Sequence, residues 1–75
     1  AETDAEYAAK VETIVQGLGA DAVDECKAYI REACMRQKGS TRLTVCRTYA
    51  DSIKPTASST QGAIVCKAAT DALPK

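Results

Sequence analysis

Four cysteines constrain this chain more than any other feature of its sequence. They stand at Cys26, Cys34, Cys46 and Cys66 of 75 residues, and the chain contains no histidine. An even number of cysteines in so short a chain is typical of a disulfide framework formed in an oxidising compartment. The sequence therefore predicts a single small domain, residues 1–75, that is held by two disulfides.

The composition explains why such a chain needs covalent help. Leu, Ile and Val together supply only 12 residues, Phe and Trp are absent, and 14 alanines make up much of the apolar content. Alanine favours helix but buries little area. Since a core of this size rarely supplies more than about 3–5 kcal/mol, we expect the disulfides to provide much of the stability.

Hydrophobic periodicity predicts four helical segments, of which two lie in the first half of the chain. The first begins near Thr3, where Thr3 and Glu6 have capping-box spacing, and ends at Gly17 and Gly19. The second begins near Asp21 and ends before Gly39, after a basic last turn.

The other two helical segments lie in the second half of the chain. The third is capped by Ser40 or Thr41 and ends before Pro55, because residues that precede proline avoid helical geometry. The fourth begins near Ser58, with Gln61 at capping-box spacing. The expected buried stripes are Tyr7, Val11, Ile14, Val15 and Leu18; Val23, Cys26, Ile30, Ala33 and Cys34; Leu43, Cys46, Tyr49, Ala50 and Ile53; and Val65, Cys66, Ala69, Ala72 and Leu73.

Residues 41–49 also fit a short β-strand, because they alternate and are rich in β-branched side chains. The spacing of Leu43, Cys46 and Ala50 favours a helix instead. The predicted fold is therefore all-α: a compact bundle of three to four short antiparallel helices with two disulfides.

Helix geometry restricts how the cysteines can pair. Cys26 and Cys34 lie eight residues apart on one predicted helix, which separates their Cα atoms by about 12 Å. A disulfide needs Cα atoms within about 7 Å, so two of the three connectivities remain. In a helical hairpin that turns near residues 38–40, Cys34 lies opposite Cys46. We therefore favour the pairs Cys34–Cys46 and Cys26–Cys66.

The same cysteines offer little for metal or catalytic chemistry. The gaps between them hold 7, 11 and 19 residues, whereas zinc ligands usually stand two to four residues apart within a pair. Without histidine there is no Ser-His-Asp or Cys-His arrangement, and the carboxylates of the first third suit caps and solvated faces. We expect no catalytic residue, no metal and no cofactor, and hence no enzyme.

Charge is balanced over the whole chain but is unevenly distributed along it. Residues 1–25 carry a net charge of −6, and residues 26–54 carry +5. We favour packing of the first helix against the next two, with ion pairs along the contact. The other interpretation is a basic face around the second turn, formed by Arg36, Lys38 and Arg42, that binds an acidic protein surface.

Nucleic acid and membranes fit the chain poorly as partners. Only three aromatic residues are present, the pI is not basic, and no nucleic-acid-binding motif appears. No apolar run approaches the roughly 20 residues that a membrane span needs.

The remaining function classes are modules that bind other molecules. The chain starts at Ala1 without a methionine, and we expect a secreted protein after removal of a signal peptide. It would bind another protein or receptor, as a signal, toxin, inhibitor or effector does. The alternative is a carrier of a small apolar ligand or lipid between helices. A homodimer also fits the alanine-rich helices.

The predicted helix count and the pair Cys34–Cys46 resemble saposin-like proteins, a family of lipid-associated helical domains. That family has six cysteines, with a pair near each terminus that this chain lacks. The resemblance therefore assigns no functional residue here.

Overall fold

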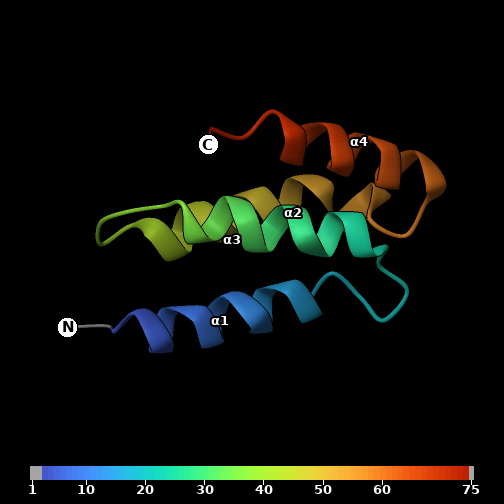
Figure 1. Ribbon diagram of the computed structural model, residues 1–75. Coiled ribbons are helices and arrows are strands. Elements are labelled where there is room, and N and C mark those ends of the chain that lie inside the picture. The colour runs from blue at the N-terminus through green and yellow to red at the C-terminus, as the bar shows by residue number, and fades with distance from the viewer. Residues whose placement is uncertain (1–2, 75) are drawn as a thin grey trace.

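The computed structural model describes residues 3–74, which form four α-helices and one short 3₁₀-helix, with no strand in this range (Figure 1). These elements are α1 (Asp4–Gln16), α2 (Asp24–Met35), α3 (Arg42–Ile53), η1 (Lys54–Thr56) and α4 (Thr60–Asp71). The predicted all-α fold is confirmed, and the alternative strand at residues 41–49 is wrong because α3 covers most of it.

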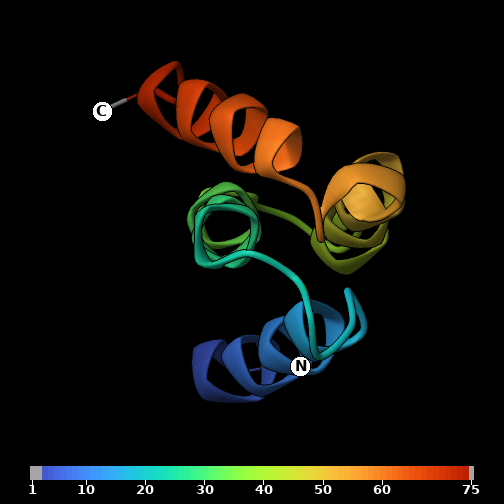
Figure 2. The same ribbon diagram turned by 90° about the vertical axis from the view of Figure 1, so that its right-hand side faces the viewer.

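The helix α2 lies at the centre of the bundle. It packs against α1, α3 and α4, and α1 also packs against α3. Figure 2 shows this arrangement end-on, with α1 and α4 on opposite sides of α2. The Cα radius of gyration is 11.8 Å, and the smallest principal extent is only 17 Å. The outer helices α1 and α4 therefore each keep one face open to solvent.

The first two helices begin at residues set by different interactions. The Thr3 hydroxyl accepts a hydrogen bond from the Glu6 backbone N–H at 3.1 Å, which confirms the predicted cap of α1. The prediction that the second helix begins near Asp21 is wrong, because α2 begins at Asp24. The Val23 N–H donates to the Ala57 carbonyl at 2.7 Å, and this contact with a distant segment holds Val23 in an extended conformation.

Of the two predicted caps, Ser40 and Thr41, Thr41 is the N-cap residue of α3. Its side chain forms no capping hydrogen bond. Pro55 ends α3, but Lys54 before it keeps helical dihedral angles, contrary to the rule used for the prediction. The chain instead continues as η1. Pro55 lies in the first turn of η1, where a backbone N–H would have no partner within the helix, so the missing N–H of proline costs nothing there.

The start of α4 differs from the prediction by one residue. Ser59, not Ser58, is the N-cap, and its hydroxyl accepts a hydrogen bond from the Gly62 N–H at 2.9 Å. Gly62 itself packs tightly against the end of η1. An added Cβ would lie 1.8 Å from the Thr56 carbonyl oxygen, so only glycine fits at this contact.

The core lies where α1, α2 and α3 meet, and α4 adds little to it. Its buried side chains include Tyr7, Val11, Val15, Leu18, Cys26, Ile30, Cys34, Cys46 and Ala50. On α4 only Gly62 and Cys66 are buried. The predicted burial of Val65 and Ala72 is wrong: Val65 is 52% exposed and Ala72 is also exposed, because α4 turns its Gly62–Cys66 face towards α2.

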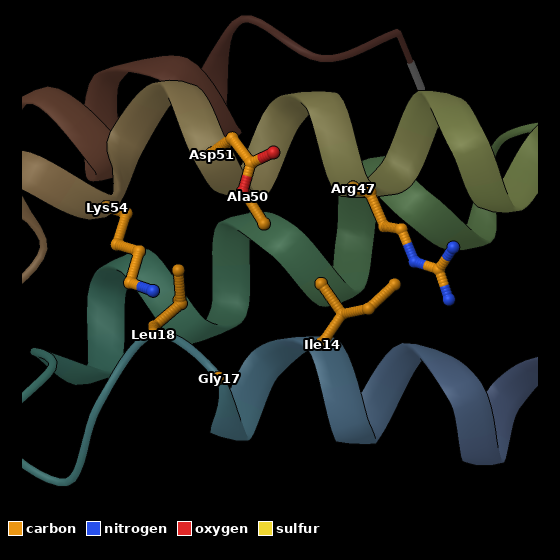
Figure 3. Close-up of a pocket in the computed structure, with 7 residues that line it drawn as sticks. All are labelled: Ile14, Gly17, Leu18, Arg47, Ala50, Asp51 and Lys54. Carbon is orange, nitrogen blue, oxygen red and sulfur yellow. The ribbon is translucent and has the colours of Figure 1, made fainter.

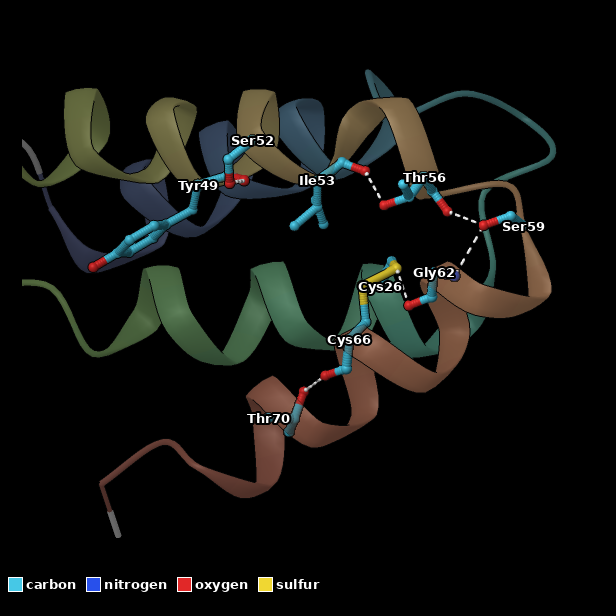
Figure 4. Close-up of a disulfide and its surroundings, with 9 residues drawn as sticks. All are labelled: Cys26, Tyr49, Ser52, Ile53, Thr56, Ser59, Gly62, Cys66 and Thr70. Atoms are coloured by element: carbon cyan, nitrogen blue, oxygen red, sulfur yellow. Dashed lines mark hydrogen bonds between the residues drawn. A yellow bond between two sulfur atoms is a disulfide. The ribbon is translucent and has the colours of Figure 1, made fainter.

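Both favoured disulfides are present, and both have one cysteine on α2. Cys26 pairs with Cys66 at a Cα separation of 4.9 Å, and Cys34 pairs with Cys46 at 5.0 Å. All four side chains are buried and none is a free thiol. Figure 4 shows Cys26–Cys66 between α2 and α4, with the Gly62 carbonyl oxygen 3.3 Å from the Cys26 sulfur. Two disulfides are compatible with an oxidising compartment.

Candidate functional site

A surface hollow lies between the second half of α2, α3 and the residues that follow α4. We name it the tyrosine groove. Its volume is about 750 Å³. It is lined by Tyr29, Ala33, Met35, Arg36, Gln37, Lys38, Tyr49, Leu73 and Pro74. A volume in this range is typical of sites that bind small molecules or side chains of a partner.

The groove exists because α4 is attached to α2 but makes few contacts with α3. The disulfide at Cys66 fixes the first half of α4 on α2, and the second half then diverges from α3 (Figure 2). Tyr49 extends from α3 towards the side where α2 and α4 lie (Figure 4). Tyr29 and Tyr49 are both half-buried, so each ring keeps an open edge.

The two cations of the groove have different surroundings. The Arg36 guanidinium donates from Nε to the Pro74 carbonyl at 2.9 Å and from Nη1 to the Glu32 carboxylate at 2.8 Å. Arg36 thus links the residues after α4 to the end of α2. Lys38 is exposed and has no ion pair or side-chain hydrogen bond within residues 3–74. Its ammonium group is therefore available to an anionic group entering the groove.

Arg42, the third predicted binding residue, lies in a different place. Its Cζ is 4.0 Å from the centre of the Tyr7 ring, and its guanidinium lies 3.5 Å from the Asp4 carboxylate. Only 18% of the Arg42 side chain is exposed. The structure thus brings Arg36 and Lys38 to one groove and places Arg42 in the contact between α1 and α3. Partner binding by the three residues stays a prediction.

Ion pairs between α1 and its neighbours account for part of the uneven charge. One of them is the pair of Arg42 with Asp4. In another, the Arg31 guanidinium donates two hydrogen bonds to the Glu12 carboxylate, at 2.7 and 3.1 Å. The hydrogen bond from Arg31 lowers the pKa of the Glu12 carboxyl, and the same bond raises the pKa of Arg31. Both side chains are about half exposed, so the pair contributes little stability. These contacts agree with the favoured interpretation of the charge pattern.

Two further hollows are weaker candidates. Figure 3 shows the smaller, of about 220 Å³, between the end of α1 and α3, with Ile14 and Leu18 facing Ala50. The second, of about 440 Å³, contains Glu12 and Arg31, whose charges already pair with each other. Neither joins an aromatic surface to an available charge, as the tyrosine groove does.

Metal-binding and membrane-spanning features are absent from residues 3–74. No three acidic or cysteine side chains lie together in a way that could hold a metal ion, and every buried side-chain nitrogen or oxygen has a hydrogen-bond partner. No helix in this part of the chain has the length and apolarity needed to span a bilayer.

The tyrosines of the groove were missed by the sequence analysis as site residues, although one signal was available. In a helical hairpin with Cys34 opposite Cys46, position 29 lies opposite position 51, within two residues of Tyr49. The disulfide register therefore brings the two aromatic residues to a similar level along the hairpin. Leu73 gives no such signal, because its place depends on how α4 crosses α2.

The chain has no significant match among protein-family models, curated proteins or solved structures.

Proposed function

We propose that this protein is a secreted, non-enzymatic binding module whose tyrosine groove receives a segment of another protein. The segment carries an apolar or aromatic side chain next to an acidic one. The observation that carries the proposal is the combination of two half-buried tyrosines with Lys38, a cation that has no partner within residues 3–74.

The chemistry of the groove supports a protein ligand. Tyrosine, methionine and arginine are enriched where proteins bind one another, and the groove contains all three types. The aromatic edges supply apolar contact, while Lys38 and Arg36 favour a carboxylate and disfavour a basic segment. The two disulfides give the groove a rigid frame, which lowers the entropy lost on binding.

Peptide selection followed by mutagenesis tests this proposal. Short random peptides displayed on phage are selected on the immobilised, oxidised protein, and the enriched sequences are expected to combine Asp or Glu with Leu, Phe, Tyr or Trp. Lys38→Glu and Tyr49→Ala should each weaken binding of the selected peptides by about tenfold or more. Lys54→Glu, an equal charge change on η1 outside the groove, is the matched control and should leave binding unchanged. Selected peptides that are indifferent to both groove variants would refute the proposal.

A carrier of a small apolar anion is the second candidate, because the groove lies between helices and Lys38 suits a carboxylate. Against it, the groove is open along one side, whereas small-ligand sites usually enclose most of the ligand surface. Native mass spectrometry with added decanoate separates the two. A retained one-to-one adduct that disappears in Tyr49→Ala would favour the carrier over the protein-binding module.

A further inference from the structure

An apolar stripe runs along the outer face of α4, away from the rest of the molecule. Ile64 is 68% exposed and Val65 is 52% exposed, and the exposed residues Ala68 and Ala72 continue the same line. Steps of three and four residues place these side chains on one side of a helix. We name this set the α4 stripe. Of the three large exposed hydrophobic residues in the described part of the chain, two belong to it.

A pair of opposite charges borders the stripe on one side. The Lys67 ammonium lies 3.8 Å from the Asp71 carboxylate, and the two side chains are 71% and 69% exposed. At 100° per residue both fall on the same flank of Ile64 and Ala68. The base precedes the acid along the chain, so an antiparallel copy of the helix places its acid near this base and its base near this acid.

The shapes along the stripe are also complementary in the antiparallel direction. The large side chains, Ile64 and Val65, lie in its first half, and the small ones, Ala68 and Ala72, lie in its second half. Two antiparallel helices place large residues of one copy against small residues of the other. Parallel helices would instead oppose Ile64 to Ile64 and leave a gap between the alanines.

We propose that the α4 stripe binds the same stripe of a second copy of this chain, with the two α4 helices antiparallel about a two-fold axis near Ala68. In this register Ala68 lies opposite its counterpart, and Ile64 of each copy packs over Ala72 of the other. Lys67 of each copy reaches Asp71 of the other along the common flank. A two-fold dimer needs such a self-complementary surface.

The size of the stripe sets the strength of this dimer. The helix is about 18 Å long at 1.5 Å per residue, so the interface is smaller than the roughly 800 Å² per partner of a standard one. The dimer is therefore weak and depends on concentration. None of the four residues of the stripe lines the tyrosine groove, so this inference does not rest on the proposed function.

Complementary charge variants test both the contact and its direction. Sedimentation velocity of the wild type over a dilution series up to about 1 mM is expected to show a monomer–dimer equilibrium. In Lys67→Glu, positions 67 and 71 are both acidic, and in Asp71→Lys they are both basic. Like charges then face each other across the contact, so each variant alone should dimerise about tenfold more weakly. An equimolar mixture should restore association as a heterodimer. The helical circular dichroism of each variant should match that of the wild type. The control Lys54→Glu should dimerise as strongly as the wild type.

Three results would overturn the inference. The first is a wild type that stays monomeric at about 1 mM. This result counts against the dimer even if the protein is found to bind lipid vesicles or another protein. The second is a dimer that both single variants form as well as the wild type. The third is an equimolar mixture that associates no better than its components, which would exclude the antiparallel pairing of Lys67 with Asp71.

Discussion

The two outer helices, α1 and α4, are attached to the same central helix in opposite ways. The helix α1 has no cysteine and buries large side chains along its whole length, among them Tyr7, Val11 and Val15. The helix α4 buries only Gly62 and Cys66, and a disulfide fixes it to α2. The buried contacts that hold α1 are therefore spread along the whole helix, whereas those that hold α4 lie in one turn.

This difference places the candidate binding surfaces on the side of α4. Few side chains of α4 enter the core, so its outer face presents the α4 stripe, and Leu73 and Pro74, which follow the helix, line the tyrosine groove. By contrast, α1 turns Tyr7, Val11 and Val15 inward, and two of its three acids, Asp4 and Glu12, pair with Arg42 and Arg31. The helix that contributes least to the core is the one with surface left for a partner.

Removal of the disulfide between α2 and α4 should have the largest effect on this contrast. Loss of a cross-link that closes a 40-residue separation costs about 4 kcal/mol in the chain-entropy estimate. In Cys26→Ala/Cys66→Ala, hydrogen exchange should show unprotected amides throughout α4 and protected amides in α1. In the matched variant Cys34→Ala/Cys46→Ala, the amides of α4 should stay protected from exchange, and those of α3 should lose more protection than those of α4. Loss of protection in α1 and α4 together would show that the two helices do not differ as described.

Gly62→Ala should have the next largest effect. The new methyl group meets the Thr56 carbonyl, so the first turn of α4 must shift and stability should fall by about 1–3 kcal/mol. Chemical denaturation measures the loss. Gly17→Ala is the comparison variant, because Gly17 already has helical dihedral angles, and its added Cβ, 3.2 Å from the Ile14 carbonyl oxygen, requires a much smaller shift than that of Gly62. Equal stabilities of the two variants would contradict the close contact of α4 with η1.

Tyr7→Phe should have the smallest effect, because the other buried residues of α1 remain. The Tyr7 hydroxyl donates to the Cys34 carbonyl at 2.6 Å, and loss of this buried bond costs about 1 kcal/mol. Tyr49→Phe is the control, since the Tyr49 hydroxyl forms no hydrogen bond within residues 3–74. A Tyr7→Phe protein as stable as the Tyr49→Phe protein would show that packing alone holds α1.

Much of the fold could be predicted because local rules decide it. The Thr3 cap and the end of α3 before Pro55 follow from local helix rules, and the two disulfide pairs follow from helix geometry together with a hairpin between α2 and α3. Two residues of the predicted buried face of α4, Val65 and Ala72, were assigned wrongly for a physical reason. Hydrophobic periodicity weighs side chains, and Gly62 has none, yet its lack of a side chain lets the start of α4 pack against Thr56, while the disulfide at Cys66 holds the same face on α2.

The candidate site was harder to predict than the fold. Arg36 and Lys38 were identified from charge around a turn, and the structure places both in the tyrosine groove. Charge alone could not separate them from Arg42, because the stacking of Arg42 on Tyr7 depends on how α1 packs against α3. The groove itself arises from the divergence of α4, which no local pattern encodes.

The contact of Gly62 with Thr56 also has an evolutionary consequence. Since neither the four cysteines nor this glycine can be replaced without cost, the fold constrains five positions separated by gaps of seven, eleven, fifteen and three residues. The alanine-rich surface of α4 can meanwhile change freely in any lineage that does not use it. Distant relatives of this protein should therefore be recognisable by the spacing of these five residues after overall sequence identity has been lost.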